Sequence, residues 1–394
     1  MSNTVITDSA KLRAAINLVS PCRGKFKPGQ NMDIFLCYMF KVIPDVRLTV
    51  LTMDGHGNCI AKEVPIERGG EHGTYYVYGP KLKKLLNLIP NEPIQITFMH
   101  SQVEIKTARG EYYIAVLDTL QEEAKESVEI KGKLRLEIPD FRKWLKYTSF
   151  CASIDEIRQQ MCGVHFDTSG GHLQIAATDG KLLTHIDAVS VETDFDDNFT
   201  IPNNSIKYLS RSLPETGMLD VEIYQKIIEF TTGAENNRTF ITNSLERGLY
   251  PNYKAVIPSE EVLWPVKLNR RELHSAAQRA SLMASDISNL IVLSLLAKDN
   301  KIRLSSKNHD EDTECQETID AQYTHNDAAN EQCPDRLGFH GRRLISVLYH
   351  LPADDITMFV KNSYEPTVFR PSNRKEDDDK ILYLLMNMRI CDDD

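Results

Sequence analysis

The sequence lacks several features that would each assign it to a class of protein. No run of 18 apolar residues occurs in its 394 positions, which argues against a membrane-spanning helix. The eight cysteines form no C-x-x-C pair, so a zinc ribbon or thioredoxin-like site is excluded and free thiols in a reducing cytosol are expected. The opening residues MSNTVITDSAKLR have neither the basic stretch nor the apolar core of a signal peptide. We therefore expect a cytoplasmic protein with no membrane partner.

Motifs of catalysis are also missing. The eleven histidines form no H-x-x-x-H or H-E-x-x-H pair, and no G-x-S-x-G, P-loop or G-x-G-x-x-G occurs. Asp54 and Asp179 are candidates for paired carboxylates, but about 125 residues separate them and each lies in an Asp-Gly turn. We predict that the protein is not an enzyme and has no cofactor or metal, with an unrecognised enzyme as the weaker alternative.

The sequence does contain one pattern of helix, proline and strand three times. The segment KLKKLLNLIP spaces its apolar residues along one face of a helix that Pro90 ends. The alternating apolar residues of PIQITF then predict a half-buried strand. The same order recurs around Pro214 and Pro352, and each proline follows the first apolar residue of its helix by eight positions. This agreement indicates an internal repeat.

An earlier helix is predicted in each copy, with possible N-caps at Asp8, Asp140 and Asn269. Strand-like runs such as VRLTVLTMDG, LQIAATDG and KIRLSS lie between the two helices. Each copy then spans roughly 130 residues, a common domain size. We predict an α+β fold of three repeated domains, with boundaries at 1–131, 132–259 and 260–394, in which two helices pack on antiparallel sheets.

Positive charge is in the minority, since 46 Lys and Arg face 56 Asp and Glu for a net charge of −10. Net charge does not say where the charges lie. The outward faces of the second helices are expected to carry Lys81, Lys83, Lys84, Lys207, Arg211, Arg342 and Arg343. Those of the first helices are expected to carry Lys11, Arg13, Arg142, Lys143, Lys146, Arg270, Arg271 and Arg279. Each such face is either ordinarily solvated or part of a surface that follows a phosphate backbone without reading bases.

Four motifs make the sequence resemble the bacterial sliding clamp, the β subunit of DNA polymerase III. They are ATDG at 177–180, YPNYKAVIP at 250–258, GFHGRRLISVL at 338–348 and YLLMNMRI at 383–390. The resemblance implies a head-to-tail homodimer that closes a six-domain ring, with helices lining the hole. Duplex DNA would pass through the hole without sequence preference. DNA polymerase, the clamp loader and other proteins with a clamp-binding motif would be the further partners.

The resemblance also implies three sets of functional residues. Those expected to form the partner-peptide pocket are Met161, Thr178, Lys181, Leu182, Leu183, Pro251, Ala255, Val256, Thr367, Met386, Met388, Arg389 and Ile390. Those expected to face DNA are Lys25, Lys27, Lys81, Lys84, Lys146, Lys207, Arg211, Arg279, Arg342 and Arg343. The dimer seam would pair a strand at Tyr112, Tyr113 and Ile114 with a helix end at Leu282 and Met283, although core packing accounts equally well for these five.

The sequence departs from the family pattern at several positions. Asn387 stands where a proline is usual, and Leu182 where an arginine is common. Asn203 and Asn204 replace a basic pair, and the segment 391–394 (Cys-Asp-Asp-Asp) extends beyond the usual end. These changes leave a second interpretation open, a clamp-like scaffold that binds partner peptides but does not encircle DNA.

Overall fold

The computed structural model describes residues 3–24, 33–117, 129–246, 248–259, 263–324, 333–373 and 378–390. The chain separates into two compact units. One comprises Met1–Arg142 and Ile201–Glu246, and the other comprises Lys143–Thr200 and Arg247–Asp394. In the described part of the chain, no helix is long and apolar enough to cross a membrane.

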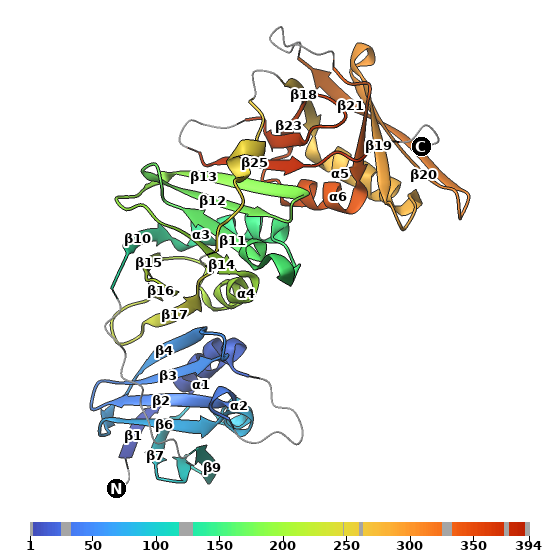
Figure 1. The fold of residues 1–394 in the computed structure, drawn as a ribbon. Helices are drawn as coiled ribbons and strands as arrows, with labels where there is room; N and C mark the ends of the chain where they lie inside the picture. The colour runs from blue at the N-terminus through green and yellow to red at the C-terminus, as the bar shows by residue number, and fades with distance from the viewer. Residues whose placement is uncertain are drawn as a thin grey trace. The chain divides into compact units, whose positions relative to one another are not determined.

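Three successive stretches of the described chain share one order of elements (Figure 1): a strand, a helix, four strands, a second helix and three strands. The first stretch adds a two-residue strand, β5 (Arg68–Gly69). Its other elements are β1 (Asn3–Asp8), α1 (Ser9–Val19), β2 (Cys37–Ile43), β3 (Arg47–Met53), β4 (Cys59–Pro65), β6 (Gly73–Tyr78), α2 (Gly79–Leu88), β7 (Pro93–Phe98), β8 (Gln102–Lys106) and β9 (Glu111–Leu117).

The second stretch consists of β10 (Gly132–Glu137), α3 (Ile138–Thr148), β11 (Gly163–Asp167), β12 (His172–Thr178), β13 (Leu182–Glu192), β14 (Asn198–Pro202), α4 (Asn203–Ser212), β15 (Met218–Ile223), β16 (Ile227–Thr232) and β17 (Thr239–Ser244). The third consists of β18 (Trp264–Asn269), α5 (Arg270–Met283), β19 (Leu290–Leu296), β20 (Lys301–Asn308), β21 (Thr313–Tyr323), β22 (Arg336–His340), α6 (Gly341–His350), β23 (Asp355–Val360), β24 (Thr367–Pro371) and β25 (Lys380–Leu385). The predicted α+β class and the threefold repeat of elements are confirmed.

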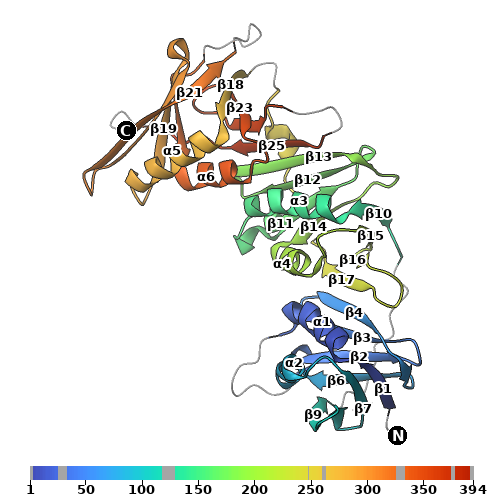
Figure 2. The same cartoon turned by 180° about the vertical axis from the view of Figure 1, so that it is seen from behind.

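Each unit is built on one large antiparallel sheet. The strand order in the first is β10-β15-β16-β17-β4-β3-β2-β6-β9-β8-β7-β1-β5, and in the second β14-β11-β12-β13-β25-β24-β23-β18-β21-β20-β19-β22. Helices cover the sheets, and both views show α5 and α6 side by side in the second unit (Figure 1, Figure 2).

Two ladders join neighbouring repeats into these sheets. In the first unit β4 pairs with β17, with Cys59 opposite Thr242. In the second unit β13 pairs with β25, with Leu182 opposite Leu385. In both cases the strand that follows an Asp-Gly turn pairs with the last strand of the next repeat. The repeats are therefore joined by the main-chain hydrogen bonds of antiparallel ladders.

The second helices end where the prolines predict. α2, α4 and α6 each end two residues before Pro90, Pro214 and Pro352, because the residue before a proline disfavours helical dihedrals. Two of the predicted caps are also confirmed. Asp8 accepts hydrogen bonds from two backbone amides of α1, and Asn269 does the same for α5. The third is wrong, because α3 begins at Ile138 and Asp140 lies inside its first turn.

Three arginines expected on outward helix faces instead join the two helices of their repeat. Arg13 donates to the carbonyls of Leu86 and Ile89 at 2.8 and 2.6 Å. Arg142 donates to the Leu213 carbonyl at 2.9 Å. Each arginine thus satisfies carbonyls at the C-terminal end of the second helix, where no helical partner exists and a positive charge is favoured.

In the third repeat a different position of the first helix makes this link: Arg270 is the first residue of α5, whereas Arg13 and Arg142 are the fifth residues of α1 and α3. The Arg270 side chain is largely buried. It donates to the carbonyls of Leu348 and Ala353 at 3.0 and 2.7 Å and pairs with Asp354 at 2.8 Å. The outward placement predicted for Arg13, Arg142 and Arg270 is therefore wrong. The carbonyls at a helix end have no backbone partner. A nearby guanidinium binds them strongly because its hydrogen bonds are charge-assisted.

Replacing Arg270 tests this link. Arg270→Met retains an apolar stem but leaves these carbonyls unpaired, so we expect the free energy of unfolding to fall by about 2 kcal/mol. Urea unfolding followed by circular dichroism measures the loss. The exposed Arg303 of β20 offers a matched control, and Arg303→Met should change stability little. Equal effects of the two substitutions would contradict a specific role for Arg270.

Candidate functional site

The predicted pocket residues gather around the ladder between β13 and β25. Leu182 and Leu183 lie opposite Leu385 and Leu384. Just past the ladder, the Met386 amide donates to the Lys181 carbonyl at 2.9 Å. The pairing places two residues that follow the ATDG turn beside the start of the C-terminal segment, although about 200 positions separate them in the sequence.

The ATDG turn is held by its own side chains. Asp179 Oδ1 accepts hydrogen bonds from the amides of Lys181 and Leu182 at 2.8 and 2.7 Å. Thr178 Oγ1 donates to the Leu182 carbonyl at 2.7 Å. Gly180 has a φ of +85°, and a Cβ on it would lie 3.9 Å from Met161 Cε. The turn therefore needs glycine for its conformation, and Met161 approaches the turn at this glycine.

The C-terminal segment of residues 386–390 is fixed on two sides. The Met388 amide donates to the Gly338 carbonyl at 2.7 Å. A Cβ at Gly338 would lie 2.6 Å from the Met388 carbonyl oxygen and 3.0 Å from Ile390 Cγ1, so the glycine of the GFHG motif permits this approach. The residues beyond it, 391–394, lie outside the described part of the chain.

Asn387 ties the same segment to β24. Its Oδ1 accepts a hydrogen bond from the buried Thr367 hydroxyl at 2.8 Å, and its Nδ2 donates to the Asn362 carbonyl at 3.2 Å. Proline has no side chain able to make these two bonds. The departure from the family pattern therefore has a structural use here, one that could not be predicted from the residue type alone.

The segment of residues 250–257 covers the other part of the ladder. Tyr250 and Tyr253 are buried in a cluster with Leu183 and Leu384. The short helix η5 (Tyr253–Val256) carries Ala255 and Val256, both exposed, beside the buried Tyr253. Pro251 and Arg389 are exposed as well. All thirteen predicted pocket residues thus belong to the second unit. Hydrogen bonds link Thr178 to Leu182 and Lys181 to Met386 directly. Other pocket residues attach to the same surface through Gly180, Asn387 and Gly338: Met161, Thr367, Met388 and Ile390.

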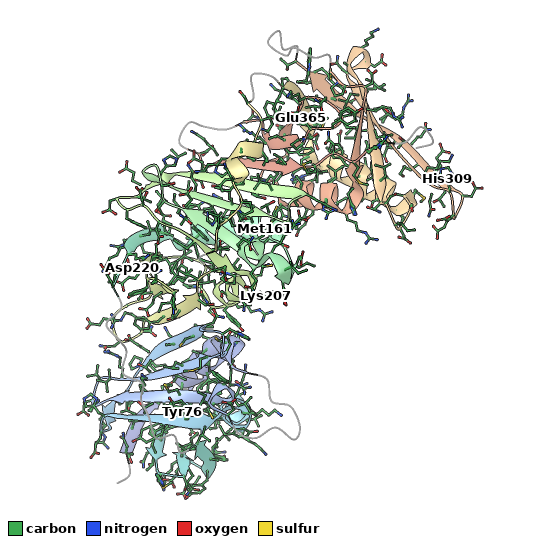
Figure 3. The ribbon with its side chains drawn as sticks, in the orientation of Figure 1. Tyr76, Met161, Lys207, Asp220, His309 and Glu365 are labelled. Carbon is green, nitrogen blue, oxygen red and sulfur yellow. The ribbon has the colours of Figure 1, made fainter. Side chains whose placement is uncertain are left out.

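The cations predicted to face DNA fall into three groups. Lys25 and Lys27 lie outside the described residues. Arg279 and Arg343 have carboxylate partners, Glu317 and Asp179 respectively. The others are exposed on helices: Lys81, Lys84, Lys146, Lys207, Arg211 and Arg342. Of these, Arg342 also lies 3.7 Å from the exposed Asp286 carboxylate. Figure 3 labels Lys207 on α4 and, in the other unit, Met161 of the pocket.

Comparison with known proteins supplies the family. The model of the central domain of the DNA polymerase III β subunit matches residues 135–252, and that of its C-terminal domain matches residues 254–389. Together the two cover well over half of the chain. The chain belongs to the bacterial DNA polymerase III β sliding clamp family.

Individual relatives agree with this assignment. A β sliding clamp from Synechocystis is 26% identical over 305 residues, 73% of each chain. One from Haemophilus influenzae is 22% identical over 360 residues, covering 88% of this chain and 90% of the relative. A solved DNA polymerase sliding clamp from Pseudomonas aeruginosa superposes with a TM-score of 0.85 at 19% identity, over 98% of this chain and all of that one.

The five residues predicted for the clamp dimer seam lie near open strand edges. Tyr112 and Tyr113 of β9 are 39% and 54% exposed, whereas Ile114 is buried. Leu282 is 75% exposed at the end of α5. The Met283 carbonyl accepts a hydrogen bond from Thr313 at 3.1 Å, so this helix end lies at the start of β21.

The two carboxylates weighed as catalytic candidates have structural tasks in this clamp chain. Asp54 accepts hydrogen bonds from the His56 amide at 2.8 Å and from Asn58 Nδ2 at 2.7 Å. Asp179 holds the ATDG turn as described above. The described residues contain no cluster of three His, Cys, Asp or Glu side chains able to hold a metal ion.

Two histidines, His165 and His185, pack against the segment of residues 250–257, and the sequence does not predict these contacts. His165 stacks on Tyr250 with ring centroids 4.1 Å apart, and its Nδ1 lies 3.1 Å from Thr200 Oγ1. His185 packs against Tyr253 with centroids 5.5 Å apart. Burial lowers the pKa of both imidazoles to about 4. The one available signal in the sequence is that each histidine lies within a strand-like run of apolar residues.

These histidines predict a loss of stability in acid. Below pH 6.5 an unfolded chain protonates both imidazoles, whereas the folded chain resists until about pH 4, so stability falls as the pH drops through that window. The loss should be about 3 kcal/mol for each group. Urea midpoints measured between pH 7 and pH 4 should show a flatter pH dependence for His165→Phe with His185→Phe. The exposed His309 provides the control, and an unchanged slope in the double variant would contradict the assignment.

Proposed function

We propose that two copies of this chain close head to tail into a ring around duplex DNA and tether DNA polymerase and other DNA-processing proteins to it. The ring performs no chemistry and holds no cofactor. Its contribution is topological, because a closed ring stays on DNA while sliding along it. The proposed place of action is the cytoplasm, and the clamp loader is the partner expected to open the ring.

The observation that carries the ring is a pair of unpaired strand edges. The ladders β4–β17 and β13–β25 each join the strand after a turn to the last strand of the next repeat. By element order, the corresponding strands left over are β21 of the third repeat and β9 of the first. Among the described residues, Thr313–Asp320 of β21 pairs only with β20. Glu111–Ala115 of β9 likewise pairs only with β8 within the part of the chain that the structure describes.

A third ladder between β21 of one copy and β9 of a second copy would complete the series. Exposed edges of this length normally need cover, and the exposed Tyr112, Tyr113 and Leu282 would provide apolar area beside the new ladder. Such an interface joins two different surfaces, and it remains finite only if the rotation closes a ring. Two chains of three domains each, with boundaries at 1–131, 132–259 and 260–394, give the proposed six domains.

The exposed helix cations support passage of DNA. Lys84, Lys207 and Arg342 occupy helices at equivalent places in the three repeats. Contacts from such flexible side chains to phosphates are sequence-independent, which suits sliding. The remaining acidic excess of the chain then lies elsewhere and repels the phosphate backbone.

We propose the thirteen pocket residues as the binding site for partner peptides. Met386 and Met388 supply flexible thioether side chains that adapt to different apolar residues. Leu182 and Leu183 provide aliphatic walls, and Lys181 and Arg389 are exposed cations suited to carbonyls or carboxylates of a bound peptide. The ladder beneath them supplies the rigid support that a binding site requires.

Retention on DNA tests the ring. With its loader, the clamp placed on a nicked circle should remain bound through gel filtration and should leave after the circle is linearised, because only a ring is trapped by topology. A native mass of about 90 kDa, twice 44.8 kDa, is the accompanying expectation for the dimer. Equal loss of the clamp from circular and linear DNA would contradict the proposal and favour a scaffold that binds peptides without encircling DNA.

A double substitution tests the pocket. Met386→Ala with Met388→Ala removes two apolar side chains from the proposed peptide site, so we expect peptide affinity to fall at least about tenfold, worth 1.4 kcal/mol. Fluorescence anisotropy with a clamp-binding peptide measures the affinity. The native mass should stay that of the dimer. Met218 of β15, exposed in the other unit, gives the control Met218→Ala, and unchanged affinity in the double variant would show that the pocket lies elsewhere.

A further inference from the structure

The last turn of α6 carries an exposed tyrosine that the functions proposed above do not use. Tyr349 is 64% exposed, and it lies three residues before Pro352. The prolines align the three second helices, and the same position holds Arg211 in α4 and Asn87 in α2. Arg211 is one of the exposed cations predicted to face DNA. The repeat therefore gives Tyr349 the place of a residue predicted to contact DNA.

Tyr349 belongs to a row of rings that crosses the second unit. Its ring meets that of His350 nearly at right angles, with centroids 5.0 Å apart. His274 lies 6.4 Å away on α5, the helix beside α6 (Figure 2). His350 in turn stacks on Phe150 of the short helix η3 (Ser149–Cys151), with centroids 3.7 Å apart and ring planes 6° from parallel. Tyr349 is the most exposed ring of this row.

The rings beside Tyr349 are themselves held in place. His350 Nδ1 donates a hydrogen bond to the Ser346 carbonyl at 2.8 Å. The His350 carbonyl accepts one from the hydroxyl of the buried Tyr383 at 3.2 Å. Phe150 also packs against the Tyr383 ring, with centroids 5.8 Å apart. Tyr349 therefore rests on a fixed surface, so a ligand that stacks on its ring loses little free energy in ordering it.

Two cations of the predicted DNA surface accompany the exposed ring. Lys146 of α3 is exposed, and burial together with its charge lowers the pKa of His350. Arg342 precedes Tyr349 by seven residues, which places it on the same side of α6 about 10 Å away along the axis. Its contact with the exposed Asp286 is a surface ion pair, which contributes little. Both cations thus remain suited to phosphate groups.

An exposed aromatic ring among cations matches one kind of DNA better than another. The bases of a duplex are stacked on each other and present only their edges, so a single ring on a helix surface cannot stack on them. An unpaired base has a free face, and proteins that bind single strands combine cations along the backbone with aromatic rings under the bases. An apolar side chain of a partner protein would cover Tyr349 as well, but it would gain nothing from Lys146 and Arg342.

We propose that Tyr349 is a stacking site for an unpaired base of DNA, such as a gap or a single-stranded template exposes. The base lies against the exposed face of the ring, while Lys146 and Arg342 contact phosphates of the same strand. The site is separate from the thirteen residues of the peptide pocket. It rests on the proposed function, because it requires DNA to pass along the helices.

Fluorescence anisotropy on the full-length protein tests this site with a labelled oligothymidylate and a duplex of the same length. Tyr349→Ala should weaken binding of the single strand about fivefold or more, because one stacked base is lost, and should weaken duplex binding less. Tyr349→Trp should preserve the affinity for the single strand, since it keeps an aromatic face. Tyr349→Leu keeps an apolar side chain without that face and should not preserve it.

Tyr364 offers the matched control, because it is 80% exposed and lies outside the helices. Tyr364→Ala should leave the affinity for the single strand unchanged, and circular dichroism establishes that each variant is folded. Photo-crosslinking of an oligonucleotide that carries 5-iodouracil, followed by mass spectrometry, should locate the linked base on Tyr349. This measurement identifies direct contact, which a merely structural role of the tyrosine would not produce.

Three results would overturn the stacking site. They are no binding of the single strand by the wild-type protein up to about 100 μM, the weak end of non-specific DNA binding, equal losses for single strand and duplex in Tyr349→Ala, and full affinity in Tyr349→Leu. Failure of the ring is a separate result, because it is measured by the retention of the wild-type protein on nicked circles. A retained clamp whose affinity for the single strand ignores Tyr349 would contradict this site alone.

Discussion

The ladder between one repeat and the last strand of the next is the interaction on which the rest of the structure depends. It turns separate α+β repeats into continuous sheets and brings Leu183 opposite Leu384, although about half of the sequence lies between them. The pocket candidates on both sides of the β13–β25 ladder meet for this reason alone. The same pairing, extended to the open edges of β9 and β21, leads to the proposed ring, so pocket and ring share one structural cause.

A second constraint acts inside each repeat. The arginines Arg13, Arg142 and Arg270 bind the carbonyl end of the second helix, and a proline follows that end in every copy. Proline stops the helix but leaves its last carbonyls without partners. The guanidinium then donates hydrogen bonds to these carbonyls, and it joins the first helix to the second. Arg13 and Arg142 make this link from the fifth position of the first helix and Arg270 from the first, so the contact recurs although the position differs.

The sequence predicts the local parts of this fold well and the long-range parts poorly. Apolar spacing and Pro90, Pro214 and Pro352 locate the second helices, because helix ends depend on neighbouring residues. The contacts that a long side chain makes do not depend on its neighbours in the sequence. Arg13 and Lys11 look alike in the sequence, yet one binds carbonyls of another helix while the other is exposed. Nothing within a few residues of either distinguishes them.

In the candidate site, too, some features are predictable from neighbouring residues and others depend on long-range contacts. Asp179 and Gly180 are predictable as a turn because aspartate accepts backbone amides and glycine permits a positive φ. Arg343, expected to face DNA, lies 3.4 Å from Asp179, and the role of Asn387 depends on Thr367 and Asn362 being close. Such contacts follow from the β13–β25 ladder and the adjoining turns rather than from local propensity. A family resemblance locates these residues without explaining them, whereas the ladder explains why an Asp-Gly turn, a buried threonine and a C-terminal segment form one surface.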